Sequence, residues 1–172
     1  MPATSLVPKS GPTSVVSIGR LAYGHAGDRP PRVYVYGLPS RALKAVSAEG
    51  VTGPAVLSPD GRFVAVNDGS QVIVHSVEDG STRALPGPPE PGTVAAWSTD
   101  GRSLFVVESF GDRVCVFQRE LTTGVRLLVR EIRPQMPAGV TAFDVFVSRN
   151  GQSYAYTVSQ RLANVFVVEG LR

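Results

Sequence analysis

Residue types that commonly carry chemistry are scarce in this chain of 172 residues, which contains one cysteine and two histidines. A lone Cys115 excludes an intrachain disulfide. It alternates with valines in the segment Arg113–Gln118, which indicates a small apolar side chain in a strand. His25 and His75 lie 50 positions apart and have no partner at metal-ligand spacing. We therefore expect no metal site.

Long apolar runs and one-sided charge are also missing. No run approaches the roughly 18–20 apolar residues of a membrane-spanning helix, and the first residues lack the apolar core of a signal peptide. The chain as written is therefore expected to be cytoplasmic, or extracytoplasmic if it belongs to a longer membrane-anchored protein. Seventeen basic and fourteen acidic residues give a net charge of +3. They form no basic cluster, so we expect no nucleic-acid partner.

The common catalytic signatures do not occur either. The sequence has no G-x-S-x-G elbow, no phosphate-binding loop, no G-x-G-x-x-G and no H-E-x-x-H. We accordingly predict no catalytic residue and no bound cofactor. Asp60 and Asp100 could serve as general bases, but each precedes a glycine, and this position indicates a turn-forming side chain.

What the sequence does contain is a repeated pattern of apolar runs and turns. Eighteen glycines and fourteen prolines accompany 42% hydrophobic residues, which is typical of turn-dense β structure. The segments Ala55–Arg62, Thr93–Arg102 and Asp144–Gln152 each join an apolar run to a serine and then to Asp-Gly or Asn-Gly. An alternating apolar run follows each of them. This arrangement predicts a β-hairpin at each site.

The expected turn residues are Asp60 with Gly61, Asp100 with Gly101, and Asn150 with Gly151. Such dipeptides favour two-residue type I′ turns, which require positive φ at both central residues. The three glycines are separated by 40 and then 50 positions. Repeats of about 40–50 residues, each with four short strands, are typical of β-propeller blades.

The strands expected from alternation divide the chain into four units. The first has Val15–Ala22, Arg32–Tyr36 and Ala42–Val46. The second has Ala55–Leu57, Phe63–Asn67, Gln71–Ser76 and Thr82–Leu85. The third has Val94–Trp97, Leu104–Glu108, Arg113–Gln118 and Val125–Glu131. The fourth has Phe143–Val147, Ser153–Val158 and Asn164–Glu169.

The predicted fold class is therefore all-β, with two complete and two partial four-stranded antiparallel units of an open or partial propeller. A flexible lead-in over residues 1–14 precedes a single domain over 15–172. The units span about 15–50, 51–90, 91–138 and 139–172, and Pro-Gly-rich linkers separate them. We expect fewer than roughly one residue in ten to be helical.

A family resemblance follows from these motifs. The segments SPDGR and WSTDGR resemble TolB-type, WD-like propeller repeats of bacteria. Near the end, Arg130–Gly139 and Gly151–Arg172 resemble the C-terminal part of propeller regions attached to bacterial eukaryote-like Ser/Thr protein kinases, notably at Tyr154–Tyr156 and Val168–Leu171. The chain departs from the pattern at its third turn, which is Arg-Asn-Gly. No kinase motif is present, so kinase activity does not carry over.

Two functions remain open on this basis. The first is a non-catalytic module for protein or ligand binding, forming the C-terminal portion of a larger sensor or scaffold. The alternative is a lactonase-like propeller hydrolase, because Leu104–Thr123 faintly resembles lactonase repeats. The expected partners are a protein or peptide, missing propeller blades, or a second copy through self-association of the terminal blade faces. Trp97 lies on an inner strand and is expected to pack between blades rather than to bind a ligand.

Overall fold

The computed structural model describes residues 21–24, 32–37, 42–51, 53–68, 71–89, 91–111, 113–133, 140–142 and 144–160. Within these ranges every regular element is a β-strand, from β1 to β15. The predicted all-β fold class is confirmed. No helix capable of crossing a membrane is found in the described residues.

Two complete four-stranded antiparallel sheets form the middle of the molecule. The second blade consists of β4 (Ala55–Leu57), β5 (Phe63–Asp68), β6 (Gln71–Ser76) and β7 (Thr82–Ala84), hydrogen-bonded in that order. The third blade consists of β8 (Thr93–Trp97), β9 (Ser103–Phe110), β10 (Arg113–Glu120) and β11 (Arg126–Ile132), also in chain order. This simple up-and-down order places the first strand of each sheet innermost, as in a propeller blade.

In the described part of the chain, the first and fourth blades lack a four-stranded sheet. The first has β1 (Leu21–Gly24), β2 (Arg32–Gly37) and β3 (Ala42–Ala45). In the fourth, β13 (Val145–Val147) pairs with β14 (Tyr154–Tyr156), while β12 (Val140–Ala142) pairs with β15 (Ser159–Gln160). The predicted strands Phe143–Val147 and Ser153–Val158 are observed as the shorter β13 and β14, and β12 and β15 lie outside the predicted ranges. The predicted strand Asn164–Glu169 and most of Val15–Ala22 lie outside the described residues.

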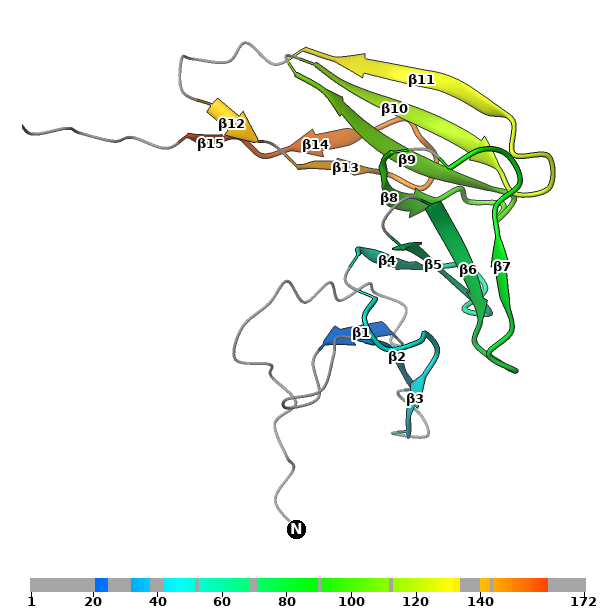
Figure 1. The fold of residues 1–172 in the computed structure, drawn as a ribbon. Coiled ribbons are helices and arrows are strands. Elements are labelled where there is room, and N and C mark those ends of the chain that lie inside the picture. The colour runs from blue at the N-terminus through cyan, green and yellow to red at the C-terminus, as the bar shows by residue number, and fades with distance from the viewer. Residues whose placement is uncertain are drawn as a thin grey trace, which may run out of the picture.

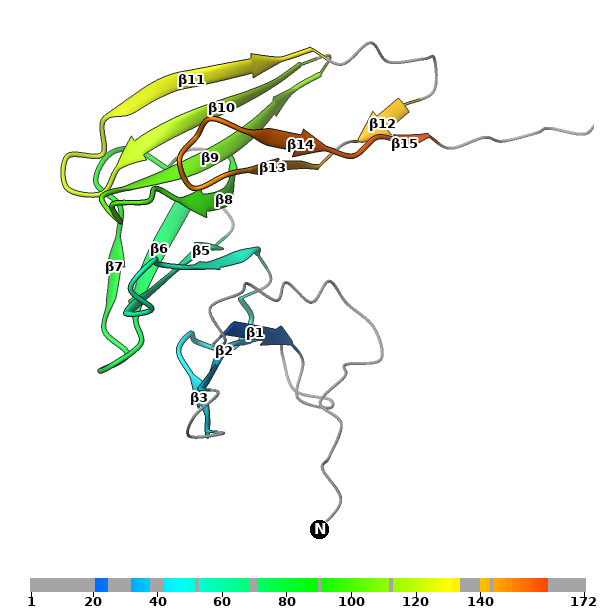
Figure 2. The ribbon, with the colours of Figure 1, turned by 180° about the vertical axis from the view of Figure 1, so that it is seen from behind.

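The sheets succeed one another as a fan and do not close into a ring (Figure 1). Viewed from behind, β8 again lies at the junction where the third blade meets the second and the fourth (Figure 2). Strand β8 contacts β4 and β5 of the second blade on one side and β13 of the fourth blade on the other. The arrangement is that of part of an open propeller.

Strand alternation explains why the hydrophobic core is divided between neighbouring blades. On β5, Val64 and Val66 face the first blade, whereas Ala65 faces the third. On β9, Leu104 and Val106 face the second blade, whereas Phe105 faces the fourth. Successive side chains of a strand point to opposite faces, so a blade covered on both faces needs a nearly continuous apolar run. This explains the almost unbroken burial of β9.

The fourth blade differs from the inner blades in the exposure of its outward face. Val56 and Ala96 occupy equivalent positions on β4 and β8, and each packs against the core shared with the following blade. Phe146 is the equivalent residue on β13, and its side chain is 61% exposed. Interior interfaces are thus apolar and closed, and the outward face of the fourth blade presents an aromatic ring to solvent.

The repeated turns have a different geometry from the two-residue type I′ turns that the sequence suggested. The N–H of Gly61 donates to the carbonyl of Ser58 at 3.0 Å, so Pro59 and Asp60 are the central residues. Proline fixes φ near −65°, which excludes a type I′ turn with proline at its first central position. Gly61 instead has φ +73° just after the turn. Four residues, not two, therefore connect the paired Ser58 and Phe63.

Candidate functional site

The turn motif shared by the three repeats is a hydrogen-bonded unit built by a serine and the residue two positions later. The Ser58 hydroxyl donates to Asp60 Oδ1 at 2.6 Å, and Asp60 Oδ1 accepts the Arg62 N–H at 3.0 Å. The Phe63 N–H donates to Ser58 Oγ at 2.9 Å. Side-chain oxygens thus satisfy backbone donors that the turn leaves without strand partners.

The other two turns repeat this network closely. Ser98 donates to Asp100 at 2.6 Å, and Ser148 donates to Asn150 Oδ1 at 2.7 Å. Gly101 and Gly151 have φ of +69° and +70°. Asn150 replaces the aspartate without loss of the network, because an amide oxygen accepts the same bonds. All six predicted turn residues therefore lie in turns, where Oδ1 of Asp60, Asp100 and Asn150 accepts hydrogen bonds.

The structure brings the three turns together along one rim of the fan. The Thr99 N–H donates to the Arg149 carbonyl at 3.0 Å, which joins the third blade's turn to that of the fourth. A Cβ added to Gly101 would lie 3.8 Å from Pro59 Cδ, so the turns of the second and third blades are also neighbours. A Cβ on Gly151 would lie 2.8 Å from Phe105 Cζ. The rim is a structural seam between successive blades.

Hydrogen bonding lowers the pKa of the turn aspartates. The Ser58 hydroxyl, followed by the Arg62 N–H, lowers the pKa of Asp60, and Ser98 with the Arg102 N–H does the same for Asp100. In the β6–β7 turn, the Ser76 hydroxyl and then the Ser81 N–H lower the pKa of Asp79 from 3.8 to about 2. These carboxylates are ionised acceptors near neutral pH, which makes them poor general bases.

We expect an NMR titration of the Asp79 carboxyl carbon to give a pKa of about 2. Its folded pKa lies below the unfolded value, so its stabilising effect is present above about pH 4 and is lost as pH falls toward 2. Ser76→Ala should move this pKa back toward 3.8, because the largest cause is removed. Ser109→Ala, on the exposed end of β9, should leave it unchanged. A parent value near 3.8 would contradict the assignment.

A separate feature, the interblade pocket, lies between the second and third blades and has a volume of about 400 Å³. Four apolar side chains line it: Phe63, Val74, Trp97 and Leu121. Its remaining lining residues are Arg83, Gly101, Arg102, Glu120 and Thr122. Pockets that bind small ligands or side chains typically measure about 300–1,000 Å³ and combine an apolar lining with a few polar groups.

The apolar lining of the interblade pocket is fixed by the blade interface. Trp97 is 2% exposed, and its Nε1–H donates to the Val56 carbonyl of the second blade at 2.9 Å. Val74 and Leu121 belong to the same core cluster as Trp97. Trp97 is thus an interblade packing residue, as predicted, and its ring is also a wall of the pocket. The buried Val74, Trp97 and Leu121 side chains indicate that this wall of the pocket is preformed.

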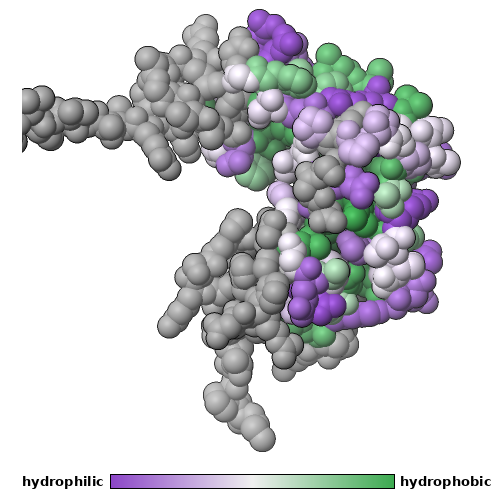
Figure 3. Space-filling view, in the orientation of Figure 1, coloured by the Kyte–Doolittle hydropathy of each residue, from purple (hydrophilic) through white to green (hydrophobic). Residues whose placement is uncertain are grey.

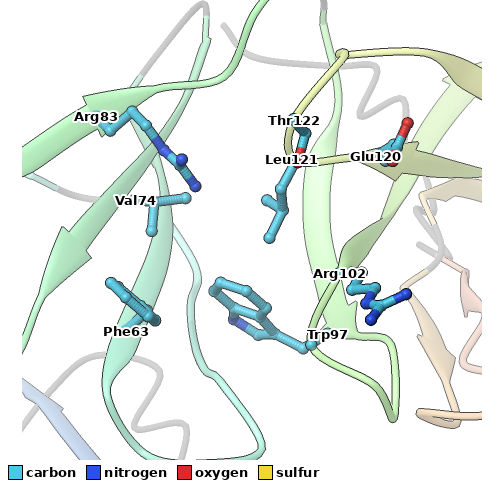
Figure 4. A pocket seen from close by; sticks show the side chains of 9 residues that line it. Phe63, Val74, Arg83, Trp97, Arg102, Glu120, Leu121 and Thr122 are labelled. Carbon is cyan, nitrogen blue, oxygen red and sulfur yellow. The ribbon is translucent and has the colours of Figure 1, made fainter.

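The charged side chains of the interblade pocket point in different directions (Figure 4). The Arg83 guanidinium points into the space above Phe63 and Trp97, facing the Leu121 side chain. Arg102 and Glu120 point away from that space at the opposite wall. Glu120 accepts a hydrogen bond from the Thr123 hydroxyl, and Arg102 interacts with the Asp100 carboxylate. The inward charge is therefore positive.

The residues with potential metal or redox chemistry lie elsewhere. Cys115 is buried in β10, and His75 is buried in β6. His25 is outside the described residues. In the described part of the chain, His, Cys, Asp and Glu side chains form no group of three that could hold a metal ion. In the face shown in Figure 3, hydrophilic residues of the described part of the chain are interspersed with hydrophobic ones.

The sequence analysis did not find the interblade pocket, because its residues come from two blades. A signal was nevertheless present in the repeats. Phe63 stands where the third and fourth repeats have Ser103 and Ser153. Register places Arg83 opposite Val74, and the corresponding pair in the third blade is Leu127 opposite Gln118. The second blade departs from its own repeat at the positions that line the pocket.

This architecture, with successive four-stranded antiparallel sheets packed face to face, defines a β-propeller fold. No protein-family model and no characterised protein sequence matches the chain. Solved structures similar to it include TolB from Acinetobacter baumannii, with a TM-score of 0.53 and 16% identity, covering 81% of this chain and 40% of that one. Oligogalacturonate lyase from Vibrio parahaemolyticus is also similar, with a TM-score of 0.51 and 12% identity. The match covers 66% of this chain and 37% of that one.

Dipeptidyl peptidase 4 from Porphyromonas gingivalis is a further similar structure, with a TM-score of 0.50 and 11% identity, covering 86% of this chain and 30% of that one. These identities establish a shared fold and no shared activity. The chain spans 30–40% of the length of these three proteins. The three similarities together support the β-propeller fold.

Proposed function

We propose that this chain is a non-catalytic β-propeller module that binds a protein or peptide partner through the interblade pocket. The observation that carries the proposal is the preformed pocket itself. Its apolar wall is held by the Trp97–Val56 hydrogen bond, and a single guanidinium, that of Arg83, points into it. A rigid apolar recess with one directed polar group is suited to holding one side chain of a partner.

The module's wider role, in this proposal, is that of a sensor or scaffold related to propeller regions of bacterial Ser/Thr kinases. The support comes from the terminal motif, of which Tyr154, Ala155 and Tyr156 form β14.

No specific observation favours the lactonase-like alternative. Association through terminal blade faces stays a prediction, and light scattering of the purified chain at micromolar concentration tests it.

Selection of random displayed dodecapeptides on the immobilised chain tests the binding role. We expect enriched peptides that bind the parent and lose binding to Thr122→Trp, because an indole at this exposed pocket position fills the recess. Thr93→Trp makes the same chemical change at an exposed position outside the pocket and should leave binding intact. Equal binding to both variants, or no enrichment above an unrelated propeller, would argue against the proposed function.

A further inference from the structure

We infer that the interblade pocket recognises a carboxylate attached to an apolar or aromatic group. Such a group occurs in a peptide either as its C-terminal residue or as an acidic side chain beside an apolar one. This inference rests on the proposed function and deepens it. It is carried by three features of the pocket: its directed cation, its apolar floor and its asymmetry.

The cation is Arg83 on β7. Its Cα lies directly opposite that of Val74 on the face of the second blade that looks toward the third. Among the described residues no acidic group forms an ion pair with Arg83 within 4 Å, although four ion pairs occur on other arginines. A guanidinium presents a planar fork of N–H donors that matches a carboxylate in two parallel hydrogen bonds.

The floor is apolar and partly open. Val74 and Leu121 are 4% and 8% exposed, whereas Phe63 is 36% exposed. At the equivalent position of the third blade Ser103 is buried. An aromatic ring that the second blade, unlike the third, places here and leaves partly in solvent has contact area available to a ligand.

The uneven distribution of charge in the pocket argues against phosphate and nucleic acid as its preferred ligands. Arg102 and Glu120 at the opposite wall are turned outward, so one inward positive charge faces a wall of apolar atoms. Recognition of phosphate or nucleic acid depends on several converging cations. A single guanidinium over an apolar floor instead matches one negative charge with an apolar neighbour.

Trp97 provides the readout, because it is the chain's sole tryptophan and lines the pocket. The probes are N-acetyl-phenylalanine and its amide, which differ only in the carboxylate. We expect the acid to change Trp97 fluorescence with a dissociation constant of about 1 mM and the amide to bind about tenfold more weakly. Arg83→Gln should remove the difference between the two probes, and Arg83→Lys should retain part of it.

Arg62→Gln is the matched control, because Arg62 is exposed, close by and outside the pocket. It should keep the tenfold preference, which separates direct contact from general electrostatic attraction. N-acetyl-Asp-Phe-amide and its Asn analogue form the second arm. A preference for the Asp compound identifies a side-chain carboxylate, and a preference confined to N-acetyl-phenylalanine identifies a chain terminus.

Failure of this inference is distinguishable from failure of the proposed function. Equal binding of acid and amide to the parent, while selected peptides still bind in a Thr122-dependent way, would overturn carboxylate recognition and leave the binding role standing. The absence of a saturable response to any acid probe, while selected peptides still bind in a Thr122-dependent way, would also overturn it. Preference for the acid that survives Arg83→Gln would assign the recognition to another group and refute the role of Arg83.

Discussion

Replacing Trp97 by alanine is expected to lower the free energy of unfolding by about 3–5 kcal/mol, the range for a fully buried aromatic residue in a core. The side chain is 2% exposed, and it is among the largest fully buried groups described. Its loss would open a cavity between the second and third blades and leave the Val56 carbonyl without the Nε1–H donor. Both effects act at the same interface.

Urea unfolding followed by far-UV circular dichroism measures this change without relying on the fluorescence of the removed residue. Trp97→Phe keeps part of the ring volume but not the donor, so it should cost less than the alanine variant. Leu127→Ala is the control, because Leu127 is 64% exposed on β11 and should change stability by about 0.5 kcal/mol or less. A Trp97→Ala loss as small as that of Leu127→Ala would refute the packing role.

Gly124→Ala is expected to cost about 2–5 kcal/mol, from the sum of left-handed backbone strain and forced displacement of a neighbour. Gly124 has φ +73°, and an added Cβ would lie only 2.2 Å from the Pro86 carbonyl oxygen. That oxygen belongs to the backbone and also accepts a 2.6 Å hydrogen bond from Arg119 Nη2. The methyl group would therefore have to separate the β10–β11 turn from the linker between blades.

Gly80→Ala separates the two causes. Gly80 also has φ +73°, but a Cβ there would meet nothing within 4 Å. It should show only the strain, about 1–2 kcal/mol. Chemical denaturation of both variants is the measurement, and equal losses would mean that the approach to Pro86 has no energetic consequence.

Because Leu121 and Thr122 precede Gly124 in the same turn, Gly124→Ala should also weaken binding at the interblade pocket.

The sequence predicted the strands of the two central blades well, because alternation and the Asp-Gly turns are local signals. Gln71–Ser76 and Ala55–Leu57 begin and end where expected. The turn type was wrong, since Pro59 imposes a backbone conformation that outweighs the dipeptide preference. The prediction missed β12 and β15 of the fourth blade, because strands of three and two residues carry too little alternation to be recognised.

The interblade pocket was beyond prediction for a different reason. Arg83 and Leu121 reach it from different blades, and their proximity depends on how two sheets pack rather than on sequence spacing. Trp97 was predicted correctly as an interblade residue, but its position beside a cavity follows only from the packing. Pocket residues become visible in the sequence only when repeats are compared, as the exchange of Phe63 for Ser103 illustrates.

The division of the hydrophobic core into clusters shared by adjacent blades makes the chain a one-dimensional array in thermodynamic terms. Stability is then approximately a sum of blade terms and nearest-neighbour couplings. Changes at Val64 and at Phe105 fall in different couplings and should be nearly additive. The second and third blades each take part in two couplings, so their amides should exchange most slowly, with opening that begins at the terminal blades and proceeds inward.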